Sequence, residues 1–82
     1  MPVEIIKTKY GYYIPMDGPW QSEEDNEAYK AAERLFEESK ASSKYLVLIQ
    51  SHHEYSHGYW IENRERSVKY PDRILKEHRL CV

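Results

Sequence analysis

The run Tyr45-Leu46-Val47-Leu48-Ile49 is apolar at all five positions and rich in β-branched and aromatic residues, which predicts a β-strand. Successive side chains of a strand point to opposite faces, so Tyr45, Val47 and Ile49 would lie on one face and Leu46 and Leu48 on the other. Both faces of this strand are therefore apolar, as is typical of a central strand covered on both sides. We expect a sheet built around it, with a cover on each face.

One long amphipathic helix is predicted upstream of this strand, from about Ser22 to Lys40. Ser22 followed by Asp25 loosely matches a capping box, and Glu23, Glu24 and Asp25 place negative charge at the start of the helix. The apolar positions then recur at spacings of three and four, at Ala28, Ala31, Ala32, Leu35 and Phe36. Such a helix has one apolar stripe and covers one face of the sheet.

The remaining elements are shorter. Strands are expected at residues 3–7, 10–14, 59–62 and 66–70, and residues 52–58 are interpreted as a solvated hairpin loop. Pro71 and Asp72 carry the signals of a helix start, with Ile74 and Leu75 on its apolar side. The predicted fold is a single α+β domain over residues 1–82. It has a small, mostly antiparallel sheet in the order β-β-α-β-β-β-α, with the long helix packed on one face and a short C-terminal helix.

Composition and charge exclude several classes of protein. The chain has 12 basic and 14 acidic side chains and a formal charge of -2, so nucleic acid is not the expected direct partner. The single cysteine, Cys81, cannot form an internal disulfide, and no apolar run is long enough for a transmembrane helix. These features predict a cytoplasmic protein that does not bind a membrane.

Three of the four histidines lie in the segment 52–57, which makes it the obvious place to look for chemistry. His53 and His57 have the spacing of a zinc-ligand pair, and His78 with Cys81 would complete a four-ligand set. A pair at this spacing converges on a helix, however, whereas these residues follow a strand. We therefore expect no metal and no cofactor. A small enzyme, or a metal-dependent nuclease that uses this cluster with Asn63, stays open as the alternative.

The aromatic residues carry the functional expectation. Eight tyrosines and two tryptophans are more than one helix can cover, and Tyr and Trp dominate protein interfaces. We expect a non-enzymatic domain that binds a protein partner, or forms a homodimer, through Tyr55, Tyr59 and Trp60. The acidic face of the helix, with Glu33 and Glu37, is a second candidate contact.

In size, acidic helix and lack of a catalytic motif, the chain resembles by type the small inhibitors made by phages and mobile elements, among them anti-CRISPR proteins. The resemblance implies a partner that is a host or defence enzyme, such as one that processes nucleic acid. It rests on no shared motif.

Overall fold

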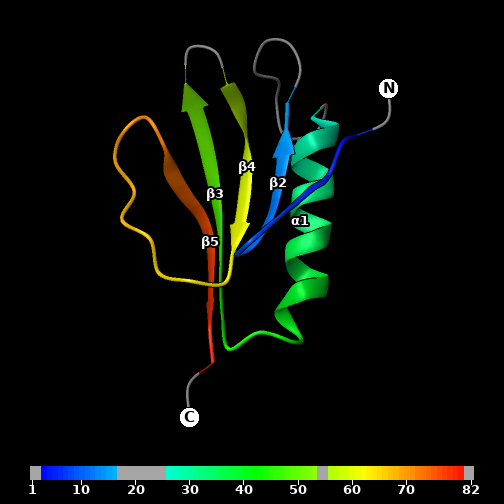
Figure 1. Ribbon diagram of the computed structural model, residues 1–82, viewed down its shortest axis with the longest axis vertical. Helices are drawn as coiled ribbons and strands as arrows, with labels where there is room; N and C mark the ends of the chain where they lie inside the picture. The colour runs from blue at the N-terminus through cyan, green and yellow to red at the C-terminus, as the bar shows by residue number, and fades with distance from the viewer. Residues whose placement is uncertain (1–2, 17–25, 54–55, 81–82) are drawn as a thin grey trace.

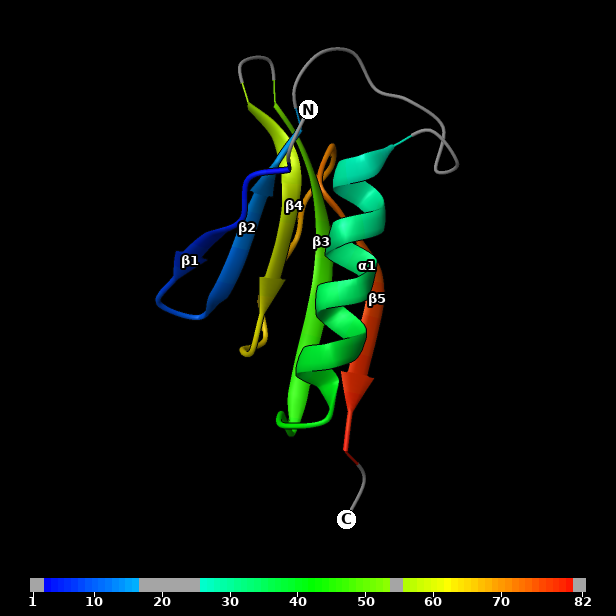
Figure 2. The ribbon, with the colours of Figure 1, turned by 90° about the vertical axis from the view of Figure 1, so that its right-hand side faces the viewer.

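The computed structural model describes residues 3–16, 26–53 and 56–80, and within that part the chain forms one helix and five strands. The elements in chain order are β1 (Ile6–Thr8), β2 (Gly11–Pro15), α1 (Glu27–Lys40), β3 (Tyr45–His53), β4 (Ser56–Glu62) and β5 (Arg73–Arg79) (Figure 1). All five strands pair antiparallel in the order β1-β2-β4-β3-β5, and α1 lies on one face of the sheet (Figure 2). The predicted α+β class is confirmed, with the order β-β-α-β-β-β.

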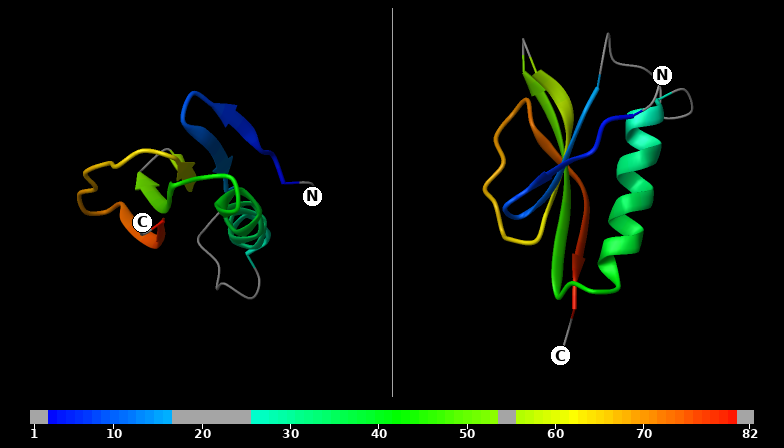
Figure 3. Two further views of the ribbon diagram at one scale, coloured as in Figure 1. Left: turned by 90° about the horizontal axis from the view of Figure 1, so that it is seen from below. Right: turned by 45° about the vertical axis from the view of Figure 1, so that its right-hand side comes forward.

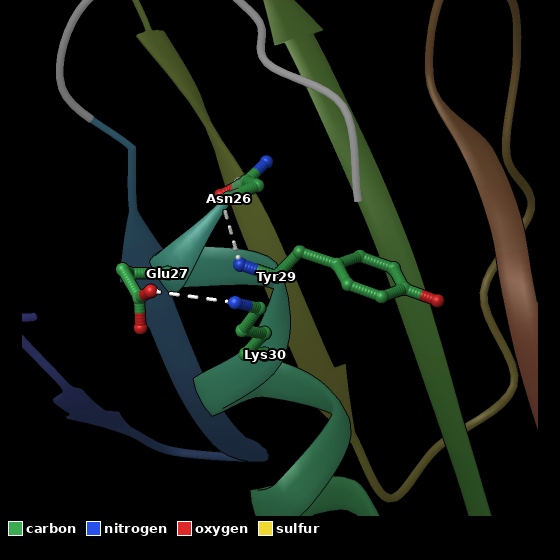
Figure 4. A network of polar contacts seen from close by, with 4 residues as sticks. All are labelled: Asn26, Glu27, Tyr29 and Lys30. Carbon is green, nitrogen blue, oxygen red and sulfur yellow. Dashed lines mark hydrogen bonds and ion pairs between the residues drawn. The ribbon is translucent and has the colours of Figure 1, made fainter. Parts of the chain in front are cut away.

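Helix α1 begins later than the sequence signals suggest. Asn26 is its N-cap, and the Oδ1 atom of Asn26 accepts a hydrogen bond from the backbone nitrogen of Tyr29 at 3.0 Å (Figure 4). Glu27 then places a negative charge in the first turn, where it interacts favourably with the helix dipole. The predicted cap, Ser22, lies outside the described residues. No helix in the described part of the chain is long and apolar enough to cross a membrane.

The core between α1 and the sheet follows the predicted pattern. Ala28, Ala32 and Phe36 are the buried residues of α1, and they pack with buried side chains of the sheet such as Leu48 and Ile61. The two alanines are small, so the helix lies close to the strands, and its contacts are with β2, β3 and β4. Strand β3 lies between β4 and β5, and the predicted central strand is therefore confirmed.

The hairpin between β3 and β4 is longer than expected. The predicted loop at residues 52–58 is wrong at both ends, because β3 extends to His53 and β4 starts at Ser56, with His52 paired to His57. Extending the ladder gives these backbone groups hydrogen-bond partners that a solvated loop would not. Only residues 54–55 lie between the two strands.

The predicted C-terminal helix is also wrong. Residues 73–79 form β5, which pairs with β3 and places Ile49 opposite Ile74 and Leu48 opposite Lys76. A short helix gains little from its own hydrogen bonds, whereas the edge of β3 offers a full set of backbone partners. A register shift between Leu48 and Ile49 accommodates Leu75, which packs against the core on the α1 side.

The second face of the sheet is covered by a loop. Residues 63–72, hereafter loop 63–72, contain no strand, so the strand predicted at 66–70 is wrong. Figure 3 shows this loop, coloured yellow to orange, on the side of the sheet away from α1. Val47 and Ile49 are almost fully buried although they point away from α1, at 1% exposure each. The two apolar faces of β3 are thus both covered, one by α1 and the other by an irregular segment, loop 63–72.

Candidate functional site

A line of large side chains crosses the sheet on the face opposite α1. The strand registers place Ile6 opposite Tyr13, Tyr13 opposite Trp60, Trp60 opposite Ile49, and Ile49 opposite Ile74. Directly opposed residues share a face, so these five side chains form one row, hereafter the cross-sheet row. Ile49 is buried within the row, whereas Ile6 and Ile74 on the flanking strands are 40% and 45% exposed. The row presents apolar surface at both edges of the sheet.

Tyr13 and Trp60 form a stacked pair within this row. Their ring centroids are 4.4 Å apart with the planes tilted by 35°, and both side chains are half-buried. The Tyr13 hydroxyl donates to the carbonyl of His57 at 3.4 Å. Gly58 makes this possible, because a Cβ atom there would lie 2.9 Å from the Tyr13 ring. The aromatic pair is therefore held in place from β4.

Glu62 lies on the same face as Trp60, and its side chain is only 3% exposed. Its carboxylate accepts a hydrogen bond from Arg66 Nη1 at 2.7 Å and lies 3.6 Å from Arg64 Nη2. The Arg66 guanidinium is 5.4 Å from the centre of the Trp60 ring, and that of Arg64 is 3.7 Å from the centre of the Tyr10 ring. A buried carboxylate and two cation–π contacts thus fix loop 63–72 against the sheet.

Between loop 63–72 and β5 the surface is hollowed into a groove of about 380 Å³. The Tyr45 hydroxyl donates to Glu77 at 3.0 Å, and Arg79 donates to Glu65 at 2.6 Å. Burial, together with the hydrogen bond to Glu77, raises the pKa of Tyr45, and the hydrogen bond to Glu65 raises the pKa of Arg79. Both groups stay protonated at neutral pH, so the groove is lined by donors that are already paired with carboxylates.

Loop 63–72 also carries the most exposed aromatic side chain among the described residues. Tyr70 is 96% exposed, four residues before Ile74 in sequence and on the loop that lies over this face. Exposed aromatic and aliphatic side chains are typical of an interaction surface.

The predicted partner-binding residues are dispersed. Trp60 belongs to the cross-sheet row, but Tyr59 points to the other face and is buried in the core at 2% exposure. Tyr55 lies outside the described residues. Glu33 and Glu37 approach Lys76 of β5 at 3.8 and 3.6 Å, so they fix α1 to the sheet as well as facing solvent.

Glu62, Arg66 and Tyr70 were not predicted from the sequence as members of this face. The spacing of Glu62 and Arg66 was a usable signal, since the two residues are four apart and opposite in charge. Ile74 was misassigned because it was placed on a helix.

The four candidate metal ligands do not form one site. His57 pairs with His52 at one end of β3, whereas His78 pairs with Leu46, six residues further along that strand. At roughly 3.4 Å per residue this is about 20 Å, too far for one ion. Among the described residues no three His, Cys, Asp or Glu side chains gather in a way that could hold a metal. Cys81 and the side chain of His53 lie outside the described part.

The nuclease alternative meets the same difficulty. Asn63 follows the end of β4 that lies beside Tyr10, and His53 pairs with Ser56 at the opposite end. His53 therefore cannot share a catalytic centre with Asn63, or with His78, which pairs with Leu46 at the Asn63 end of β3.

Comparison of the chain with protein-family models, with curated proteins and with solved structures gave no match.

Proposed function

We propose that this protein acts by binding another protein through the sheet face opposite α1. The observation that carries the proposal is the cross-sheet row, whose aromatic centre is half-buried and whose aliphatic ends are exposed. Loop 63–72, over the same face, adds Tyr70 as an exposed aromatic side chain. Trp, Tyr and Arg are the residue types that most often contribute binding energy at protein interfaces, and this face contains all three.

The charges on this face favour a protein partner over a nucleic acid. Arg64 and Arg66 are paired with Glu62, and Arg79 with Glu65. A surface that binds phosphates needs cations whose charge is not already compensated. Here the arginines serve to position the loop, and the apolar and aromatic side chains supply the contact area.

The biological setting that we propose is that of a small cytoplasmic inhibitor from a phage or mobile element, whose target is a host or defence enzyme. The support is the type of protein, namely a short chain with a slight acidic excess and an aromatic surface. A homodimer formed through the same face is the competing outcome, and the test below separates the two.

The test is site-specific photo-crosslinking in the native host. A photo-crosslinking residue is placed at Tyr70, on the proposed face, and in a matched control at Arg34, an exposed position of α1. We expect one dominant adduct from position 70 and none of that mass from position 34. Mass spectrometry then identifies the partner, and an adduct of twice the chain mass indicates a homodimer.

Affinity for the purified partner is then measured for variants of the face. Tyr70→Ala and Ile74→Glu should each weaken binding by about 1–4 kcal/mol, the usual range for interface anchors. Arg34→Ala should leave the affinity unchanged. The proposal is wrong if both face variants bind as tightly as wild type while remaining folded, or if nucleic acid is the crosslinked species.

A further inference from the structure

A pocket of about 240 Å³ lies between the β1–β2 hairpin and the C-terminal end of α1, on the α1 side of the sheet. It shares no residue with the cross-sheet row, and only Asn63 with loop 63–72. We propose that this pocket binds a small organic anion, in which a carboxylate or phosphate group is attached to a body the size of a single ring. The proposal is independent of the protein-binding function.

The floor of the pocket is apolar. Leu46 and Ile61, which are buried in the core, line it from below. Tyr12 is half-buried and lies in the same cross-strand row as Ile61, so its ring forms part of one wall. An apolar ring or aliphatic group of a ligand would be stabilised by moving from water into this pocket, because apolar and aromatic side chains surround it there.

Its charged residues are both cationic. Lys7 and Lys9 line the pocket, and no aspartate or glutamate does. Within the described residues neither lysine has an ion pair with a carboxylate. The Lys9 ammonium lies 5.6 Å from the centre of the Tyr10 ring, which leaves it free to attract an anion. Two uncompensated cations at one opening raise the local concentration of small anions.

Hydroxyl groups from the last turn of α1 and from the turn after it complete the polar rim. Ser39 and Ser43 are half-buried and line the pocket, and their hydroxyls are suited to donate to anionic oxygens. The Ser42 hydroxyl already donates to the Ser39 carbonyl at 3.2 Å. The rim therefore offers donors as well as charge.

The C-terminus of α1 opposes this binding only weakly. A helix end carries roughly half a negative charge, from carbonyls that lack partners. Here the backbone nitrogens of Ser42 and Ser43 donate to the carbonyls of Ser39 and Lys40, which reduces the exposed partial charge. The positive charge of the two lysines exceeds the partial negative charge that remains at the helix end.

The volume sets the size of the ligand. Pockets for drug-sized molecules are roughly 300–1,000 Å³, and this one is smaller. It fits a single ring with an anionic substituent, and not a dinucleotide or a peptide.

The test uses ¹⁵N-labelled protein titrated with phenyl phosphate and, in parallel, with benzoate. Either anion should shift the backbone amides of Thr8, Gly11 and Ser43, at millimolar affinity. Benzyl alcohol keeps the ring without the charge, and inorganic phosphate keeps the charge without the ring. Both should bind at least fivefold more weakly than phenyl phosphate.

Charge-matched variants separate specific from general attraction. The double substitution Lys7→Met with Lys9→Met should weaken binding at least tenfold, while the melting temperature stays near that of wild type. Lys30→Met with Lys69→Met removes the same charge from α1 and loop 63–72, away from the pocket, and should leave binding unchanged.

The proposal is overturned if neither anion shifts the pocket amides, if benzyl alcohol or inorganic phosphate binds as well as phenyl phosphate, or if the two double variants lose affinity equally. None of these results bears on the sheet face opposite α1, so failure here leaves the protein-binding proposal intact.

Discussion

The side-chain amide of Asn26 donates a hydrogen bond to the phenolic oxygen of Tyr59 at 2.8 Å, inside the core. The Oδ1 atom of the same side chain accepts from the backbone nitrogen of Tyr29. Asn26 thus caps α1 and at the same time gives a buried hydroxyl of β4 its partner. The start of the helix and the middle of the sheet depend on one residue.

Replacing Asn26 should therefore cost more than the loss of an ordinary cap. Asn26→Ala removes the cap and leaves the Tyr59 hydroxyl buried without this partner, so the free energy of unfolding should fall by about 2–4 kcal/mol. Asn26→Asp keeps a capping oxygen and should cost less. Tyr59→Phe removes only the hydroxyl and should cost about 0.5–1.5 kcal/mol. Urea denaturation measures all three, and equal midpoints for Asn26→Ala and wild type would contradict the dual role.

Gly11 allows β2 to pass close to β4. Its φ of 153° lies in the region that side chains rarely adopt, and a Cβ atom would lie 2.0 Å from the carbonyl oxygen of Ile61. In Gly11→Ala the backbone at Ile61 must move away from the new Cβ atom, and residue 11 must keep a strained φ angle. The substitution should therefore destabilise the fold by about 1–3 kcal/mol or more. Lys9→Ala, in the same hairpin and exposed, serves as the control. A Gly11→Ala protein that melts with the control would show that the approach of the strands is easily relaxed.

Leu48 and Leu35 test the two sides of the core interface. Leu48 is completely buried, so Leu48→Ala should cost about 2–5 kcal/mol. Leu35 is only half-buried against the core, and Leu35→Ala should cost clearly less. The sequence predicts both residues as core anchors of similar weight, and only the structure separates them. Urea midpoints that rank the two variants in the opposite order would contradict this difference in burial.

The central strand and the helix were predictable because their signals are local. Five consecutive apolar residues define β3, and a spacing of three and four defines α1. Each pattern decides its own secondary structure with no knowledge of the rest of the chain.

The C-terminal segment was not predictable in this way. Pro71 and Asp72 carry real helix-start signals, and Ile74 and Leu75 fit an apolar helix side. The free edge of β3 decides the outcome, and residues 45–50 are far from residues 73–79 in sequence. The sequence likewise predicts that the second face of β3 needs a cover. It does not predict that loop 63–72 provides this cover, because that contact also joins segments that are distant in sequence. The register that aligns Trp60 with Tyr13 and Ile49 is likewise set by pairings between distant segments.

Glu37 should titrate below the ordinary range of a glutamate. The hydrogen bond from Lys40 lowers the pKa of Glu37, and the charge of Lys76 lowers it further. Because the folded-state pKa lies below the unfolded one, the stability that this group contributes is present above the unfolded pKa and is lost as the pH falls through the folded one. Carboxyl ¹³C shifts followed during acid titration measure the pKa directly. Lys40→Met should raise it more than Lys76→Met, and the reverse order would contradict the assigned causes.

The contact between Glu62 and Arg66 should control whether loop 63–72 stays on the sheet. Glu62→Ala removes the buried acceptor of a 2.7 Å ion pair and leaves Arg64 and Arg66 without this carboxylate, so the free energy of unfolding should fall by about 1–3 kcal/mol. Because this carboxylate anchors loop 63–72 to the sheet, loss of it should make the amides of the loop exchange about tenfold faster in hydrogen-exchange measurements, before any change in α1. Glu65 is in the same loop and forms an exposed ion pair with Arg79 of β5, so Glu65→Ala is the matched control. Its effect on stability and on amide exchange should be much smaller. If both variants speed exchange of the loop equally, the buried carboxylate is not what holds the loop over Val47 and Ile49.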